Sequence, residues 1–157
     1  MKADLIVMEK IMGEFSNVED RLEIAALNQR YALHVDFHEI EEWVSLFTPD
    51  AVFDESEFDN PVMNGHDEIR AYGNHLTEIV RHVLHHMTTH HISDMTATSA
   101  RGRAFGLIEA VLNDGTHART HVVYEDRYEK IEGTWLMAER ILRKTIEPEV
   151  IARSAQA

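Results

Sequence analysis

The feature that most constrains the fold of this chain is a change in the spacing of its apolar residues after Met87. Before this point, apolar residues recur near the helical period of about 3.6 residues, which predicts three helices. They cover residues 18–36, 38–47 and 64–83, and a short strand over 51–55 separates the second helix from the third. The second helix is expected to end at the Thr48-Pro49-Asp50 turn, because proline disfavours a helical residue before it.

Beyond Met87, apolar and polar residues alternate, as in a half-buried strand. Four strands are predicted, over about residues 90–98, 103–113, 117–130 and 133–145. The connections "SARG", "NDGT" and "IEGT" are short and each contains a glycine, so consecutive strands should be antiparallel neighbours. The order of elements predicts an α+β domain, in which about three helices pack on one face of a curved antiparallel sheet.

Length and composition are those of an ordinary globular domain. A chain of 157 residues can bury one sizeable core, and a content of 44% apolar and 27% charged residues is typical of folded proteins. We expect a single domain over residues 1–157. Its core would cover about 18–145, with an N-terminal helical extension over 1–15 and a tail over 146–157.

Charge and residue usage exclude several classes of function. The net charge of −13 argues against nucleic-acid binding, which needs clustered Lys and Arg. The longest apolar run, Leu5–Met8, is too short to span a membrane, and no secretory signal is seen, so we expect a cytoplasmic protein. The absence of Cys excludes disulfides and thiolate chemistry.

The stretch "RHVLHHMTTHH" contains five of the eleven histidines of the chain. A metal site here would pair His82 with His86, one helical turn apart, and add His90 or His91. The Glu or Cys companions of zinc motifs are missing, and the strand period points His90 and His91 to opposite faces. We therefore predict no metal and no other cofactor, and we expect His82, His85 and His86 to lie in a polar turn.

Longer stretches resemble one protein family. The segment "ALNQRYALHVDFHEIEEWVSLFTPDAVFD" is similar to the opening of the SnoaL-like branch of the nuclear-transport-factor-2-like superfamily. The segments "NGHDEIRAY", "TTHHISDM" and "YEDRYEKIEGTWLMAERIL" match its later signatures in order, so that the resemblance covers roughly residues 20–145. It implies the nuclear-transport-factor-2-like (cystatin-like) cone, in which a bent sheet wraps the helices around a deep apolar pocket. It also implies a homo-oligomer, either a dimer or a trimer.

The resemblance implies a catalytic site as well. Scytalone dehydratase, bile-acid 7α-dehydratase and hexachlorocyclohexane dehydrochlorinase use a His on the first long strand, assisted by an Asp at the end of the first core helix. The matching residues are His90 of "TTHHISD" and Asp36 of "YALHVD", and Tyr31 falls where the dehydratases place a tyrosine. The carboxylate would orient the imidazole as general base, and the tyrosine would polarise a substrate oxygen. Asp36 could instead cap the next helix, and Tyr31 could be a core aromatic.

Four further residues are assigned to substrate binding. Glu109 and His121 are polar positions on strand faces that are otherwise apolar, so either could line the pocket or belong to a salt-bridged oligomer face. Trp43 and Phe53 complete the predicted substrate-binding set.

These residues predict a cofactor-independent lyase or isomerase for a small hydrophobic substrate, cyclic or aromatic. The reaction would couple proton abstraction to elimination, as in a dehydratase, or to deformylating carbon–carbon cleavage. The alternative is a non-catalytic module on the same fold that binds small molecules or serves assembly, such as the small subunit of a ring-hydroxylating dioxygenase. Contact between Asp36 and His90 would favour the enzyme.

Overall fold

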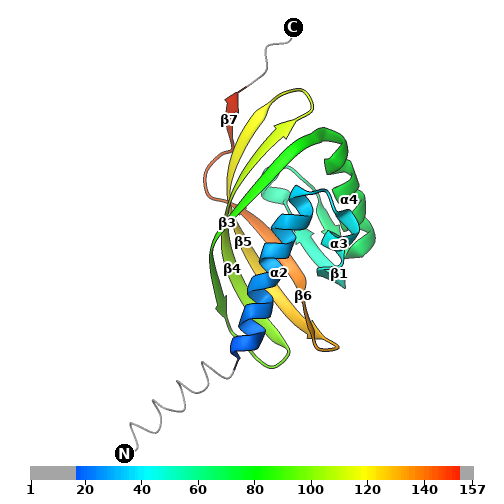
Figure 1. Cartoon of the computed structure of the whole chain (residues 1–157), viewed down its shortest axis with the longest axis vertical. Helices are drawn as coiled ribbons and strands as arrows, with labels where there is room; N and C mark the ends of the chain where they lie inside the picture. Colours follow the sequence, from blue (N-terminus) through cyan, green and yellow to red (C-terminus); the bar gives the residue numbers. More distant parts are fainter. Residues whose placement is uncertain (1–16, 153–157) are drawn as a thin grey trace, which may run out of the picture.

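A computed structural model describes residues 17–152, in which three α-helices lie against the inner face of a curved sheet (Figure 1). The helices are α2 (Val18–Asp36), α3 (Ile40–Val44) and α4 (Gly65–Ile79). The helical extension predicted over residues 1–15 lies outside the described residues and stays a prediction. The predicted tail contains a short strand, β7 (Glu149–Ala152), which pairs with β5.

Seven strands form one sheet in the order β2-β1-β6-β5-β4-β3, with β7 beside β5. The remaining bounds are β1 (Phe47–Asp54), the 3₁₀ helix η1 (Ser56–Phe58), β2 (Val62–Asn64), β3 (Val80–Ser93), β4 (Ser99–Leu112), β5 (His117–Ile131) and β6 (Thr134–Lys144). The α+β class is confirmed, but the sheet is mixed, because β1 and β6 run parallel. These two strands are far apart in sequence, so no tight turn requires them to be antiparallel.

The largest difference from the sequence prediction lies where α4 meets β3. The predicted helix runs to residue 83, whereas α4 ends at Ile79 and β3 begins at Val80. Apolar residues keep helical spacing as far as Val83, so spacing alone does not separate another helical turn from the start of a strand. The polar turn expected for His82, His85 and His86 is therefore wrong, since all three belong to β3.

A β-bulge in β3 changes which side chains face inward. Between Met87 and His90 the strand advances by three residues while β4 advances by two, and Thr88 and Thr89 are both exposed. Five positions apart, His85 and His90 would point to opposite faces of an uninterrupted strand. The extra residue of the bulge puts both on the inner face.

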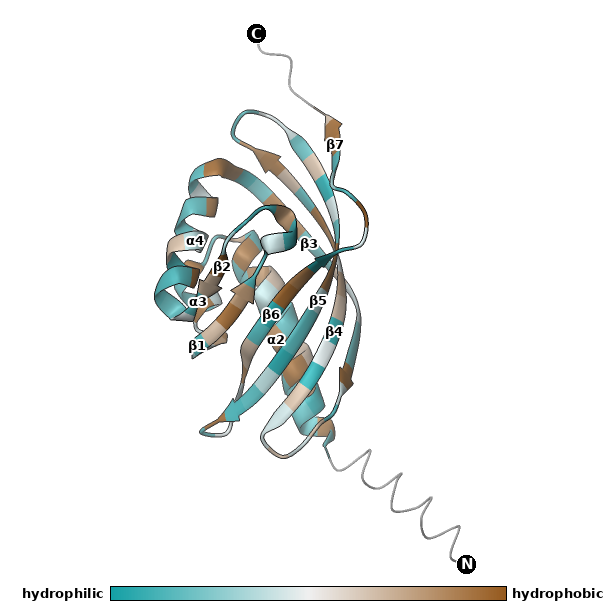
Figure 2. Ribbon diagram, turned by 180° about the vertical axis from the view of Figure 1, so that it is seen from behind, coloured by the Kyte–Doolittle hydropathy of each residue, from teal (hydrophilic) through white to brown (hydrophobic). Residues whose placement is uncertain are grey.

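Aromatic side chains fill the core between the helices and the sheet. The ring of Tyr31 meets Trp43, Phe47 and Phe53 edge-on, with centroid distances of 6.1, 6.3 and 6.4 Å. All four rings are buried, and edge-to-face packing at this distance is favourable beyond the burial of area. Burial alternates along β5, so one face of that strand meets this core. Figure 2 shows that hydropathy itself does not alternate strictly along β5 and β6, where apolar and polar residues also occur in short runs.

A buried ion pair ties α2 to the sheet. Arg140 of β6 makes two hydrogen bonds of 2.8 Å with Asp126 of β5, and neither side chain has any exposed surface. Arg140 also donates to Asn28 of α2, and its guanidinium lies 4.1 Å and 4.5 Å from the ring centroids of Tyr31 and Tyr124. A charge so far from water is tolerable only with partners of this kind.

Replacing Arg140 with Met should strongly destabilise the protein, because it leaves the Asp126 carboxylate buried without its cation. The expected loss in the free energy of unfolding is about 3–5 kcal/mol, measured by urea denaturation. The control is Arg103→Met, which breaks an exposed pair with Glu125 and should change stability little. Similar losses in both variants would contradict a special role for the buried pair.

Candidate functional site

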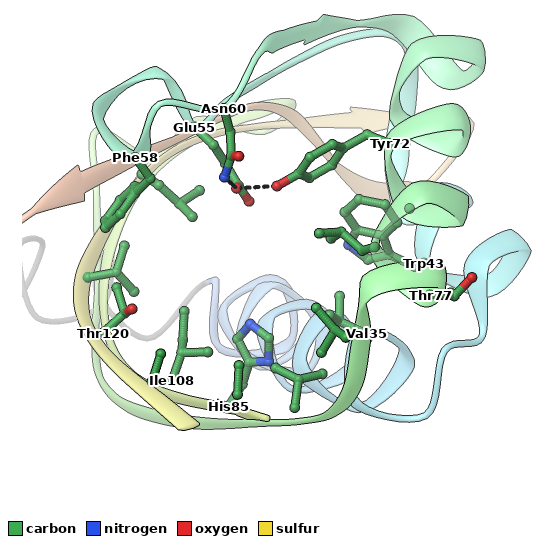
Figure 3. A pocket seen from close by; sticks show the side chains of 18 of the residues that line it. Val35, Trp43, Glu55, Phe58, Asn60, Tyr72, Thr77, His85, Ile108 and Thr120 are labelled. Atoms are coloured by element: carbon green, nitrogen blue, oxygen red, sulfur yellow. Dashed lines mark hydrogen bonds between the residues drawn. The ribbon is translucent and has the colours of Figure 1, made fainter. Parts of the chain in front are cut away.

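A cavity of about 450 Å³ lies between α4, the end of α2 and the inner face of the sheet. Figure 3 shows its side chains arranged around an open interior. The wall is mostly apolar, and a cavity of this size and character suits one small hydrophobic molecule. Representative apolar residues of the wall are Val35, Val83, Ile108, Leu112, Val122 and Leu142.

Asp36 and His85 form a hydrogen-bonded pair at this wall. Nδ1 of His85 lies 2.6 Å from Oδ1 of Asp36, and the two side chains are only 7% and 12% exposed, which shields the pair from bulk water. A carboxylate can only accept, so Nδ1 of the neutral ring carries the proton and Nε2 is the acceptor. His85 projects into the cavity, where Nε2 can take a proton from a bound molecule (Figure 3).

Local structure explains why these two residues meet. Asp36 is the last residue of α2, and the helix packs along β3, where His85 faces inward. The backbone N–H of His85 also donates to the Asp36 carboxylate, at 3.0 Å and 3.2 Å from its two oxygens. This backbone contact holds the carboxylate against the strand whichever tautomer the ring adopts.

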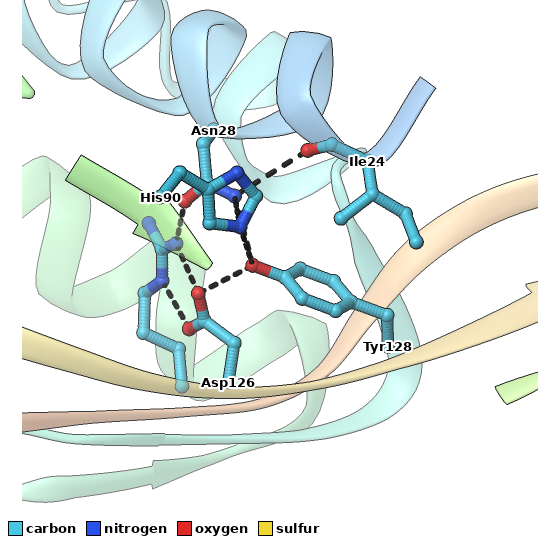
Figure 4. A network of polar contacts seen from close by, with 6 residues as sticks. Ile24, Asn28, His90, Asp126 and Tyr128 are labelled. Atoms are coloured by element: carbon cyan, nitrogen blue, oxygen red, sulfur yellow. Dashed lines mark hydrogen bonds and ion pairs between the residues drawn. The ribbon is translucent and has the colours of Figure 1, made fainter. Parts of the chain in front are cut away.

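The structure corrects the predicted pairing, because Asp36 contacts His85 and not His90. Nε2 of His90 lies 3.2 Å from Nδ2 of Asn28 and 3.3 Å from the hydroxyl of Tyr128, below the helix (Figure 4). His90 is not among the residues that line the cavity. The motif "TTHHISD" pointed to the wrong histidine for this contact because the bulge brings two histidines to the inner face.

His90 belongs to the polar network around the buried ion pair. The hydroxyl of Tyr128 donates to Asp126 at 2.6 Å and accepts from Asn28 at 2.8 Å. Burial lowers the pKa of His90; the carboxylate of Asp126 opposes this effect and the cation of Arg140 adds to it. This shift favours the neutral imidazole, and the contacts of the ring join β3 to the network that holds α2.

Two of the other predicted site residues, Tyr31 and Trp43, line the cavity. The ring of Tyr31 stands perpendicular to that of His85 at a centroid distance of 6.1 Å. Burial raises the pKa of Tyr31, which keeps its hydroxyl protonated as a donor. The indole N–H of Trp43 is buried and has no hydrogen-bond partner among the described residues.

Three predicted substrate-binding residues do not line the cavity. Phe53 is completely buried in the aromatic core. Glu109 pairs with Arg119 at 2.6 Å on the outer face of the sheet, and His121 is exposed on that face. The apolar residues that share their alternation, such as Phe105, are themselves outward and partly exposed, so the apolar pattern did not mark the inner face.

Glu55, directly after β1, is a functional candidate that sequence reasoning missed. It lies on the wall opposite His85, and its Oε2 accepts hydrogen bonds from Tyr72 at 2.6 Å and from Asn60 at 2.9 Å (Figure 3). Burial raises the pKa of Glu55, although these bonds and the charge of protonated His85 act in the opposite direction. In the sequence, no pattern distinguishes Glu55 from the other acidic residues of the same loop.

Two further features are absent from the described part of the chain. Within residues 17–152, no three His, Cys, Asp or Glu side chains are grouped so that they could hold a metal ion. None of the helices over the same range is long and apolar enough to cross a membrane.

Comparison with known proteins adds a family to this geometry. The sequence pattern of the SnoaL-like domain matches residues 16–141. No curated protein matches the sequence. A solved structure from Novosphingobium aromaticivorans, provisionally named an aromatic ring hydroxylase, is 26% identical with a TM-score of 0.81, over 85% of this chain and 94% of that chain.

Two more distant structures show the same fold. A protein of N. aromaticivorans, provisionally named a scytalone dehydratase, is 22% identical with a TM-score of 0.78, covering 88% of this chain and 92% of its own. A type 2 hexachlorocyclohexane dehydrochlorinase is 18% identical with a TM-score of 0.79, covering 91% and 97%. The family pattern covers most of the chain and the fold agrees throughout, so this protein belongs to the SnoaL-like domain family of the nuclear-transport-factor-2-like superfamily.

Proposed function

We propose that this protein is a cofactor-independent lyase that removes a proton and a leaving group from a small hydrophobic cyclic or aromatic substrate. The observation that carries the proposal is the Asp36–His85 pair at the wall of an apolar cavity. The names of two structural relatives, a dehydratase and a dehydrochlorinase, both denote eliminations and support this class of reaction. Loss of water is the elimination we favour.

Each residue of the pair has a distinct role in this proposal. Nε2 of His85 acts as general base and takes a proton from a carbon of the substrate. Asp36 holds the ring in the required tautomer and stabilises the imidazolium once it forms. Tyr31, beside His85, donates a hydrogen bond to a substrate carbonyl and stabilises the negative charge that develops there.

The same base could return its proton to another carbon, which would make the enzyme an isomerase, or act in deformylating carbon–carbon cleavage. A binding module or dioxygenase small subunit is the non-catalytic alternative, and one relative carries the name of an aromatic ring hydroxylase. We favour the enzyme because a binding module has no need of an ordered base in its apolar wall. Shielding a charged pair from water can cost net free energy even when the pair is hydrogen-bonded, so its presence in an apolar wall favours a functional role.

Replacing His85 with Ala should greatly lower the turnover of a suitable probe. We suggest 3-hydroxy-1-tetralone, a bicyclic β-hydroxy ketone whose dehydration gives 1-naphthol and can be followed by absorbance. The variant should lose on the order of 10²–10⁴-fold in kcat, because the general base is gone. The control is His90→Gln, which should keep most of the activity. Loss of activity in the control but not in His85→Ala would make His90 the base.

Replacing Asp36 with Asn should lower kcat without changing the shape of the cavity. The amide can still contact His85, but it no longer stabilises the imidazolium and it allows the other tautomer. The expected loss is again on the order of 10²–10⁴-fold, with KM for the tetralone probe little changed. A normal kcat with a higher KM would show that Asp36 only shapes the cavity.

A further inference from the structure

The cavity has a second ionisable group, Glu55, on the wall opposite His85, and the proposed role of His85 as a base does not require it. Glu55 and His85 come from opposite walls, at the end of β1 and the middle of β3, with apolar side chains between them (Figure 3). A carboxyl group in such a wall costs free energy unless it is hydrogen-bonded or paired with a charge. Its partners decide what it can do.

The hydrogen bonds of Glu55 use only one of its two oxygens. Tyr72 and Asn60 both donate to Oε2, at 2.6 Å and 2.9 Å. Among the described residues Oε1 has no hydrogen-bond partner. An oxygen that already accepts two hydrogen bonds is a poor place for the acidic proton, so in the neutral acid the proton belongs on Oε1. Oε1 is then a donor with no protein acceptor, on a residue that lines the cavity.

The surroundings of Glu55 favour the neutral form. Among the described residues no Lys or Arg forms an ion pair with it. The ionisable groups that interact with it are the hydroxyls of Tyr72, Tyr31 and Tyr124, the carboxylate of Asp54 and, across the cavity, the imidazole of His85. Burial is the largest effect on Glu55 and raises its pKa, and the carboxylate of Asp54 acts in the same direction. The hydrogen bonds from Tyr72 and Asn60 lower the pKa, as does the positive charge of His85 when that ring is protonated.

We propose that Glu55 is a second catalytic residue of this cavity, a neutral carboxylic acid that gives the proton of Oε1 to the departing oxygen of the substrate. The inference rests on the proposed function, in which His85 is the base. Nε2 of His85 takes the proton from carbon, and the electrons of that C–H bond form the C=C bond. The C–O bond breaks, and its oxygen leaves as water with the proton of Glu55. Proton transfer from His85 to Glu55 through water restores both groups.

This arrangement also defines a substrate class. A base and an acid on opposite walls act best on a molecule whose acidic C–H and leaving hydroxyl lie on opposite faces of a ring. The apolar wall between them accommodates the ring itself. Cyclic alcohols with a carbonyl group β to the hydroxyl have this layout, and the carbonyl acidifies the C–H bond.

The protonation of Glu55 can be tested without a substrate, from the free energy of unfolding as a function of pH in the wild type and Glu55→Gln. An acid with a raised pKa stabilises the folded state fully below its unfolded pKa of about 4.3, and this contribution is lost as the pH rises through the folded pKa. Gln is neutral throughout, so the stability of the variant relative to the wild type should increase with pH above that value.

A matched control for this measurement is Glu109→Gln. The hydrogen bond and charge of Arg119 lower the pKa of Glu109, so its contribution is present above the unfolded pKa and is lost on acidification. The relative stability of this variant should therefore fall as the pH rises, which is the opposite sign. A difference for Glu55→Gln that stays flat or falls with pH overturns the proposal of a neutral acid.

The role in catalysis can be tested with two probes that give the same product. 3-Hydroxy-1-tetralone loses water and needs a proton on its leaving oxygen, whereas 3-chloro-1-tetralone loses chloride and needs none. Glu55→Gln should lower kcat for the hydroxy probe on the order of 10²–10⁴-fold and leave the chloro probe nearly unchanged. His85→Ala should impair both, and Glu109→Gln should impair neither.

The activity losses of the variants on the two probes show whether the acid role of Glu55 or the proposed function itself has failed. Equal losses on both probes in Glu55→Gln would make Glu55 a positioning residue and overturn its role as acid, while the base remains supported. Full activity of His85→Ala on both probes, or no turnover of either probe by the wild type, would overturn the proposed function for this substrate class. In that case the pH dependence of stability still decides whether Glu55 is neutral.

Discussion

The buried pair of Arg140 and Asp126 is the contact on which the rest of the structure depends. It joins two neighbouring strands, and through Asn28 it holds the middle of α2 against them. The helix is also held at its start, where Asp20 accepts hydrogen bonds from Trp135 at 2.8 Å and Lys130 at 2.6 Å. Because the start and the middle of α2 are held in this way, the end of the helix is positioned beside β3.

Two polar clusters under the same helix thus have different characters. The cluster around Arg140 and His90 turns most of its polar atoms toward one another. Among the described residues, Nη1 of Arg140 and the hydroxyl of Tyr124 are buried without a hydrogen-bond partner. The two ionisable groups His85 and Glu55 of the cavity use only part of their hydrogen-bonding capacity within the protein. Nε2 of His85 and Oε1 of Glu55 have no hydrogen-bond partner among the described residues and could bind a substrate. The cavity groups differ from the structural ones because their unused hydrogen-bonding atoms belong to residues that line a cavity large enough for a small molecule.

The sequence allowed the prediction of the fold class, the extent of α2 and the place of Asp36 at its end, because these follow from helical period and motif order. Tyr31 and Trp43 were also assigned to the cavity that they line. The start of β3 and the partner of Asp36 could not be predicted. The start of β3 could not be predicted because the apolar residues there fit both the helical and the strand period. The partner of Asp36 depends on the β-bulge, in which β3 has one residue more than β4. Glu55 can be recognised as a candidate only in the folded structure, where it lines the cavity and accepts a hydrogen bond from Tyr72.

The bulge at Thr88 and Thr89 has a consequence for comparing this protein with its relatives. Because one strand has an extra residue, every side chain of β3 after the bulge lies on the face opposite to the one that regular alternation would give it. Relatives that lack the insertion would present the other set of side chains to the helix with the same motif. Equivalent residues on this strand are therefore those that share a face and a depth, and counting positions along the chain misidentifies them.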